Sequence, residues 1–252
     1  TFGDIPETLT TLTRHFGEPF ADPSAIPLYH LSKLTREYVT VALNGDGGDE
    51  AFAGYWRYWL DPWGNRYARS PRILTKKLIP ALARLLPNKA NAPVGSSLLD
   101  GIKRLEQLAA IDPRASILRW GSYFSPDWAA LLWKPDFAAQ FGARAVERFL
   151  IEKFENAHAQ SFMDRTLYTD IHAYLPGDLL VKADRMTMAN SLEGRSPFLD
   201  HELASWAARL PERMRVRGRT GKYLLRQAFA ADLPPRVQAR GKQGIGIPLG
   251  DW

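Results

Sequence analysis

The chain has 252 residues, of which 45% are hydrophobic and 24% charged, as is typical of a globular protein with one large domain or two small ones. No apolar stretch approaches the roughly 20 residues of a membrane span, and the first residues show no signal-peptide pattern. Cysteine is absent, which excludes disulfides, thiolate metal sites and a cysteine nucleophile. We therefore expect a cytoplasmic protein without a membrane partner. Because the first residue is not Met, we also expect a piece of a longer polypeptide.

The net charge of +6 is concentrated in one segment near the C-terminus. Residues 211–243 carry a charge of +7, and the rest of the chain is close to neutral. Such a local excess of basic side chains indicates an anionic partner, for which nucleotide phosphate, nucleic acid and an acidic domain are the candidates. The alternative is a solvated basic surface. The nine basic residues are Arg213, Arg215, Arg217, Arg219, Lys222, Arg226, Arg236, Arg240 and Lys242.

The first 50 residues predict a helix followed by a buried strand. Two prolines interrupt residues 18–23, because Pro lacks a backbone N–H and biases the preceding residue towards extended geometry. Residues 24–36 can then form a helix. Residues 38–43 are a β-branched and apolar run that ends at a strong turn signal, Asn44–Gly45. Because this run follows a helix and does not alternate cleanly, we expect a buried parallel strand.

The central region, from about residue 56 to 160, predicts a helical subdomain. Residues 74–86 and 143–157 show helical apolar spacing, and no strand signal of comparable strength occurs here. Six of the eight Trp fall between Trp56 and Trp133. We interpret this aromatic content as core packing and not as a cofactor site.

The C-terminal third is again mostly helical. The sequence Leu-Pro-Gly at 175–177 predicts a helix break, after which Asp178 is a plausible N-cap for a helix that reaches about residue 191. Another helix is expected to start at residues 197–200. Residues 222–230 predict a helix that follows a loop, and the Gly-rich residues 241–248 predict a further loop.

The densest chemical signal is the run Leu-Asn-Gly-Asp-Gly-Gly-Asp-Glu at residues 43–50, directly after the predicted strand. Its glycines permit sharp turns and a close approach of the backbone to a ligand. Crowded carboxylates repel one another unless a cation lies among them, and the carboxyl end of a parallel strand is where α/β folds place ligands. A Mg²⁺ ion that bridges to phosphates fits this pattern, whereas the alternative is an acidic surface turn. The residues concerned are Gly45, Asp46, Gly47, Gly48, Asp49 and Glu50.

Alternating charges near residues 182–200 form the second signal. Asp184 is expected late in a helix, and Glu193 and Arg195 lie just beyond that helix. These charges have apolar neighbours, so they suggest a partly buried ionic network. The network could bind substrate or could be purely structural.

Lys222, which follows Gly221, is the third signal. The predicted helix starts at this lysine, and the dipole of a helix disfavours a cation in its first turn. A bound anion would explain the cation, because helix N-termini favour phosphate. Arg217 and Arg219 lie just before it. The alternative is an ordinary surface lysine.

Four ordered segments together resemble the synthetase domain of the asparagine synthetase family: residues 18–27, 44–55, 175–200 and 222–252. The resemblance implies a mostly helical α/β fold, namely part of an adenine-nucleotide α-hydrolase-like (ATP pyrophosphatase) domain with a short parallel sheet and a large helical insertion. Within this partial domain over residues 1–252, we expect an α/β part at 1–59, the insertion at 60–160, and a helical substrate and phosphate side at 161–252.

The resemblance also implies a two-step reaction with ATP and Mg²⁺. ATP adenylates the side-chain carboxylate of aspartate, and ammonia derived from glutamine then gives asparagine, AMP and pyrophosphate. Asp49 resembles the family's Mg²⁺ and pyrophosphate residue, and Lys222 its catalytic lysine, with Asp46 also at a catalytic position. The residues expected to bind nucleotide or pyrophosphate are Gly45, Gly47, Asp49 and Lys222, and those expected on the substrate side are Asp184, Glu193 and Arg195.

Two departures from the family pattern shape these expectations. Asparagine synthetases usually carry Glu where this chain has Asp46, and β-lactam synthetases carry Tyr there. The family's first nucleotide loop, Ser-Gly-Gly-x-Asp-Ser, and its N-terminal glutaminase domain are absent from this chain, so we expect the chain alone to bind ATP weakly and to be inactive.

Three alternatives remain beside this interpretation. A related amidotransferase would act on a sugar acid, a peptide or a lactam-forming substrate. A basic nucleic-acid-binding module is disfavoured, because the acidic loop would repel phosphate without a metal; an inactive scaffold is the third alternative. Homodimer formation is left open.

Overall fold

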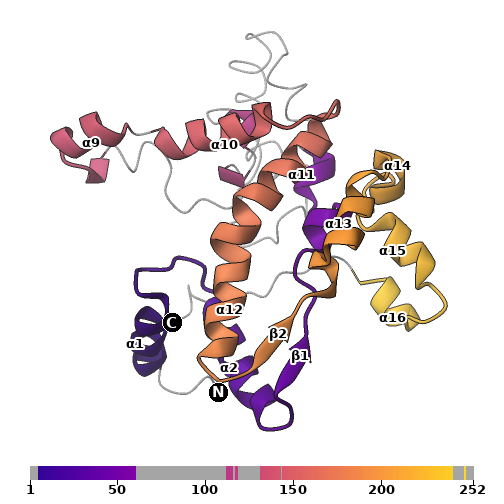
Figure 1. Ribbon diagram of the computed structural model, residues 1–252, viewed down its shortest axis with the longest axis horizontal. Coiled ribbons are helices and arrows are strands. Elements are labelled where there is room, and N and C mark those ends of the chain that lie inside the picture. Colours follow the sequence, from indigo (N-terminus) through magenta and orange to yellow (C-terminus); the bar gives the residue numbers. More distant parts are fainter. Residues whose placement is uncertain are drawn as a thin grey trace, which may run out of the picture. The chain divides into compact units, whose positions relative to one another are not determined.

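The computed structural model describes residues 5–60, 112–115, 117–118, 131–142, 144–240 and 247. This part of the chain is mostly helical and contains one short parallel sheet, which confirms the expected fold class (Figure 1). Its elements are α1 (Ile5–Phe16), α2 (Ala25–Arg36), β1 (Val41–Leu43), α3 (Gly48–Phe52), η2 (Pro113–Ala115), α9 (Pro135–Phe141), α10 (Ala145–Glu155), α11 (Phe162–His172), η3 (Leu175–Leu179), α12 (Leu180–Met188), β2 (Glu193–Arg195), η4 (Pro197–Leu199), α13 (His201–Ala208), α14 (Glu212–Arg215), α15 (Tyr223–Ala228) and α16 (Pro235–Gln238).

The chain divides into two compact units. The first comprises Thr1–Tyr55 and Asp170–Trp252, and the second comprises Trp56–Thr169. Among the described residues, no helix is both long and apolar enough to cross a bilayer. The helix predicted over 74–86 lies outside the described residues, whereas α2 and α10 confirm the helices predicted over 24–36 and 143–157.

The first unit is built around the packing of α12 against α1 and α2. Apolar side chains at helical spacing meet there, and the buried members of the cluster are Leu12, Ala25, Ile26 and Met186. Met186 has an exposed fraction of 0%. This helical layer supports the residues that lead into and out of the sheet (Figure 1).

The sheet consists of β1 and β2, which run parallel and pair Val41 with Glu193 and Leu43 with Arg195. A parallel strand was predicted here correctly, but its predicted burial is wrong, since Leu43 is 73% exposed. The physical reason is that one face alone is covered: Gly194 lies against Thr187 of α12, while Val41 and Leu43 share the opposite face.

The helix break predicted at 175–177 is also wrong. The chain passes from α11 to α12 through one turn of π-helix, η3, in which Leu180 N–H donates to the carbonyl oxygen of Leu175. A wider turn accommodates Pro176, which has no N–H to donate and would clash within a regular α-helix. Asp178 therefore lies inside this continuous helical run and is no N-cap.

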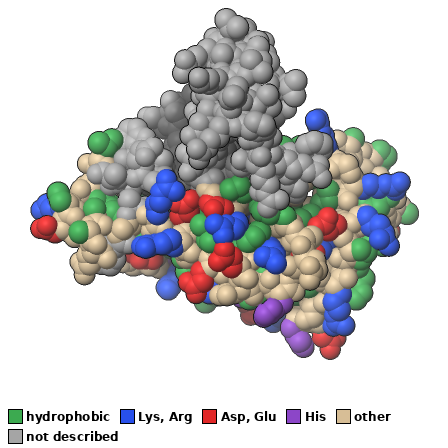
Figure 2. Space-filling model, turned by 90° about the horizontal axis from the view of Figure 1, so that it is seen from above, with side chains coloured by type: hydrophobic (Ala, Val, Ile, Leu, Met, Phe, Trp, Pro, Cys, Tyr) green, Lys and Arg blue, Asp and Glu red, His purple; other side chains and the backbone are tan. Residues whose placement is uncertain are grey.

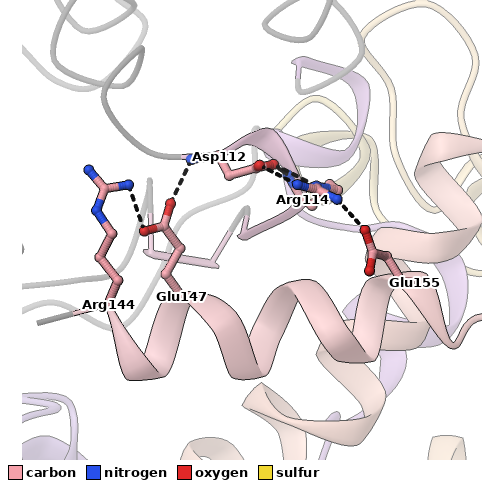
Figure 3. A network of polar contacts seen from close by, with 5 residues as sticks. All are labelled: Asp112, Arg114, Arg144, Glu147 and Glu155. Atoms are coloured by element: carbon pink, nitrogen blue, oxygen red, sulfur yellow. Dashed lines mark hydrogen bonds and ion pairs between the residues drawn. The ribbon is translucent and has the colours of Figure 1, made fainter. Parts of the chain in front are cut away.

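In the second unit, a network of charged side chains attaches residues 112–115 to α10 (Figure 3). The Arg114 guanidinium contacts both Asp112 and Glu155. Glu147 is buried, accepts from the backbone N–H of Asp112 at 3.0 Å and pairs with Arg144 at 3.0 Å. This network holds η2 against α10, and its residues take no part in the candidate site.

Candidate anion and metal site

The acidic loop begins where β1 ends, and Asn44 fixes its start. The Asn44 N–H donates to the Arg195 carbonyl oxygen at 2.8 Å, which extends the pairing with β2 by one bond. The Asn44 side-chain oxygen accepts from the Asp46 N–H at 3.1 Å and from the Ser196 hydroxyl at 2.6 Å. The carboxyl ends of both strands are therefore tied together directly below the loop.

The next turn of the loop requires glycine. Gly47 has a φ of 83°, in the left-handed region, and a Cβ there would lie 2.1 Å from Leu199 Cδ2. A Cβ on Gly48 would meet the Phe198 ring at 3.1 Å. By contrast, a Cβ on Gly45 would meet nothing within 4 Å. Gly47 and Gly48 thus serve close packing against η4, and the nucleotide role expected for Gly45 and Gly47 stays a prediction.

The structure brings Asp49 and Lys222 together, although 173 positions of sequence separate them. Lys222 Nζ lies 3.0 Å from Asp49 Oδ1, and the side chains are 30% and 13% exposed. Lys222 was expected in the first turn of a helix, which is wrong by one residue: it is the N-cap of α15 and has a φ of 52°. Because α15 has only six residues, the charge of Lys222 itself matters here more than the helix dipole.

Glu50, the neighbour of Asp49, points into the core. It is 2% exposed, and its Oε1 accepts a hydrogen bond from the Tyr55 hydroxyl at 2.8 Å. Burial raises the pKa of Glu50 above its usual value, and the nearby carboxylates of Asp49 and Asp170 add to this, against the opposing hydrogen bond from Tyr55. Lys222 thus pairs with one of the three carboxylates of the loop, and a second lies in the core.

Asp46 belongs to a second group of charges. Burial raises its pKa, as does the Asp49 carboxylate, while the Lys182 ammonium opposes the shift. Lys182 in turn forms an ion pair with Asp22. Burial also raises the pKa of Asp178 to about 6, with a contribution from the Asp22 carboxylate.

Sequence reasoning missed Lys182, Asp22 and Asp178 as part of this region. One signal was present, because Asp178 and Lys182 are four residues apart and so share one face of a helix. The contribution of Asp22 was not visible in the sequence, since the ion pair joins residues separated by 160 positions.

The expected partly buried network of Asp184, Glu193 and Arg195 is not found. Glu193 and Arg195 pair with each other at 2.7 Å on β2, and their side chains are 55% and 63% exposed. Asp184 is exposed on α12. Side chains alternate between the two faces of a strand. Glu193 and Arg195 therefore lie on the same face of the sheet, and that face is open to solvent. A substrate role for the three residues stays a prediction.

Beside Lys222 an open groove of about 800 Å³ runs between α15 and α16. Apolar side chains such as Phe229 and Leu233 line most of it, and Arg217 and Arg226 are further cations on its wall. Several basic side chains of this end of the molecule are visible at the right of Figure 2. Lys222 therefore both lines this groove and contacts Asp49.

Within the described residues, no group of three or more acidic or histidine side chains could enclose a metal ion. Asp49 and Asp46 nevertheless lie close enough for their charges to interact. Mg²⁺ is commonly held by one or two carboxylates and completes its shell with phosphate oxygens and water. The donor set thus fits a Mg²⁺ ion that arrives with a phosphate ligand, and does not fit a cage made by protein alone.

Comparison with known proteins identifies the family of the chain. The family described as asparagine synthase matches residues 1–252, and the chain belongs to this family. No solved structure gives a significant match.

Curated relatives support the same assignment. Asparagine synthetase [glutamine-hydrolyzing] 1 of Bacillus subtilis (strain 168) is 35% identical over 97% of this chain and 36% of that protein. A putative asparagine synthetase [glutamine-hydrolyzing] of Mycobacterium tuberculosis (strain H37Rv) is 33% identical over 97% of this chain and 35% of that protein. Amidase chyE of Penicillium rubens is 24% identical over 81% of this chain and 33% of that protein. The chain thus spans about a third of the length of these relatives.

Proposed function

We propose that this chain is the metal- and pyrophosphate-binding part of an ATP-dependent, amide-forming ligase. In the proposed reaction, ATP adenylates the side-chain carboxylate of aspartate with release of pyrophosphate. Ammonia derived from glutamine then displaces AMP and forms asparagine, and a glutaminase domain outside this chain supplies that ammonia. Family membership and the names of the relatives support the reaction class.

The observation that carries the proposal is the pairing of Asp49 with Lys222 at the end of the β1 strand. Asp49, with Asp46, would hold the metal ion, and the bound ion supplies positive charge to the phosphate oxygens. Lys222 is the cation that the chain itself provides. Its side chain is 30% exposed, so its ammonium can contact a phosphate oxygen while it stays against the Asp49 carboxylate. There it stabilises the negative charge that develops on pyrophosphate.

Expression of the complete gene, followed by an assay of pyrophosphate release with ATP, aspartate and glutamine, tests the reaction. We expect release that depends on aspartate and Mg²⁺, with asparagine as a product. If pyrophosphate appears only with another carboxylate acceptor, the aspartate assignment is wrong while the ligase class stands. If no carboxylate elicits it, the ligase proposal itself fails.

A matched pair of variants tests Lys222. Lys222→Ala should reduce pyrophosphate release by at least 100-fold. Removal of one hydrogen-bond donor that is well placed for developing negative charge costs roughly 2.7–4 kcal/mol of transition-state stabilisation. Arg236→Ala is the control, because it removes one positive charge from the same basic segment at an exposed position on α16. Equal effects of the two substitutions would reduce the role of Lys222 to its contribution to net charge.

A further inference from the structure

Gly54 lies at the contact between the two side chains of the site. A Cβ built on Gly54 would lie 1.8 Å from Asp49 Oδ1 and 2.5 Å from Lys222 Cε. Both distances are far below van der Waals contact. Among the glycines of the described residues, Gly54 alone has this relation to both partners. The Asp49–Lys222 ion pair therefore packs directly against the backbone of Gly54.

The backbone at this point is held in an uncommon conformation. Ala53 has a φ of 54°, in the left-handed region that disfavours residues with a Cβ. The Gly54 N–H donates to the Asp49 carbonyl oxygen at 2.8 Å, so the turn is closed on the same residue that carries the carboxylate. A strained conformation persists where the surrounding structure determines it, and such positions gather at functional sites.

Lys222 is held by the same segment. Its φ is 52°, and its N–H donates to the Phe52 carbonyl oxygen at 3.0 Å. The preceding residue, Gly221, approaches so closely that a Cβ would lie 2.3 Å from the Ala53 carbonyl oxygen. The end of α3 and the start of α15 thus meet backbone to backbone, which fixes the point from which the Lys222 side chain extends.

From this geometry we infer that Gly54 is a positioning residue: its missing side chain lets Lys222 lie against Asp49 and directs the ammonium to the pyrophosphate position. The inference rests on the proposed function and adds a residue that acts through the Asp49–Lys222 pair. A side chain at position 54 would part the two partners without removing either charge.

Titration calorimetry with inorganic pyrophosphate, in the presence and absence of Mg²⁺, tests this in the protein expressed from its complete gene. Gly54→Ala should weaken Mg²⁺–pyrophosphate binding by at least 10-fold. Gly177→Ala is the matched control, because a Cβ there meets nothing within 4 Å and the residue has no positive φ. We expect it to bind like the wild type. Unchanged affinity in Gly54→Ala would overturn the inference.

A double-substitution cycle separates positioning from a general loss of structure. If Gly54 acts through the Asp49–Lys222 pair, the addition of Gly54→Ala to a background that carries both Asp49→Ala and Lys222→Ala should change the residual affinity by less than two-fold. A further loss of 10-fold in that background would contradict the inference. If Gly54→Ala alone does not fold, removal of both colliding side chains by Asp49→Ala and Lys222→Ala should restore folding, and failure to restore it is equally contradictory.

Ala53→Gly provides a second check on the same turn. Glycine adopts a positive φ without steric cost, so the turn can keep its conformation and this variant should keep the wild-type affinity. A 10-fold loss of affinity in Ala53→Gly would mean that the Ala53 side chain, and not the space at Gly54, determines binding. Wild-type protein that binds no pyrophosphate would instead refute the proposed function itself, so the two failures are distinguishable.

Discussion

At the scale of single residues, the ionisation of Asp178 is changed mainly by burial. Burial raises its pKa to about 6, and the Asp22 carboxylate adds to the shift against the charge of Lys182. Asp22 behaves in the opposite way. Burial alone would raise its pKa, but the hydrogen bond and charge of Lys182 and the Ser24 N–H together bring it below the usual value. The Lys182 ammonium therefore favours the ionised form of Asp22, whereas Asp178 stays easier to protonate than an ordinary carboxyl group.

This difference predicts a pH dependence of stability. Because the folded-state pKa of Asp178 is raised, its protonated form favours folding at pH values below about 4, and this contribution is lost as the pH rises through about 6. Asp178→Asn should therefore be more stable than the wild type at pH 7 and have a flatter stability profile between pH 4 and 6. Urea unfolding at pH 4.5 and 7.0 measures both effects.

Asp22→Asn supplies the contrast. Its lowered pKa contributes stability above about pH 4 that is lost on acidification, so this substitution should destabilise the protein at pH 7. If both Asn variants shift stability in the same direction at pH 7, the opposite signs assigned to the two carboxyl groups are wrong.

Two glycines of the acidic loop should respond differently to the same change. Gly47→Ala places a Cβ against Leu199 at a φ of 83°, and it should lower the free energy of unfolding by about 1–3 kcal/mol. Gly45→Ala meets no atom within 4 Å and should change stability by less than about 0.5 kcal/mol. Chemical denaturation distinguishes the two, and a large destabilisation by Gly45→Ala would contradict the space seen around it.

The same loop marks how far single residues could be assigned from the sequence. The pattern identified an acidic loop after a strand, and the structure confirms that position for Asp46 and Asp49. The pattern could not show that Asp49 and Glu50 have different environments. Consecutive helical residues point about 100° apart, so in α3 the Asp49 side chain reaches Lys222 while the Glu50 side chain enters the core. Which direction is buried depends on tertiary packing, in which the Tyr55 hydroxyl donates to Glu50.

At the scale of elements, α13 begins with a well-formed cap. The Asp200 carboxylate accepts from the N–H groups of Glu202 and Leu203, both at 3.0 Å. Asp200→Ala should cost about 1 kcal/mol of stability, since it leaves these two donors without a partner in the first turn. Asp200→Asn retains an oxygen acceptor and should lose much less. Thermal unfolding of the pair checks the prediction, and equal losses would assign the effect to charge alone.

Helices were easier to predict than the connections between them. The periodicity over 24–36 and 143–157 found α2 and α10, because one buried face every 3.6 residues is a local property. Pro176 misled the prediction, since a π turn absorbs it and this depends on the surrounding helix packing. The burial of β1 could not be predicted either, because it depends on what covers the second face of the sheet.

At the scale of the whole molecule, the distribution of charge was predictable and its organisation was not. The basic excess over 211–243 follows from counting residues. Its meaning depends on Lys222, which the fold places against Asp49, and on Arg217, which stacks on Tyr223 at 5.3 Å instead of joining that pair. The basic segment therefore contains both a lysine at the site and an arginine, Arg217, with a local aromatic partner.

The exposed face of β1 has a consequence for how these molecules behave together in solution. An open parallel strand with apolar side chains can template pairing with another chain, and natural proteins block this with charges at sheet edges. Val41 and Leu43 are 37% and 73% exposed, so the 252-residue polypeptide should self-associate as its concentration rises. Val41→Lys should suppress this in light scattering, whereas Val146→Lys, a similar change at an exposed valine of α10, should not. Equal scattering from both variants would show that β1 does not cause the self-association.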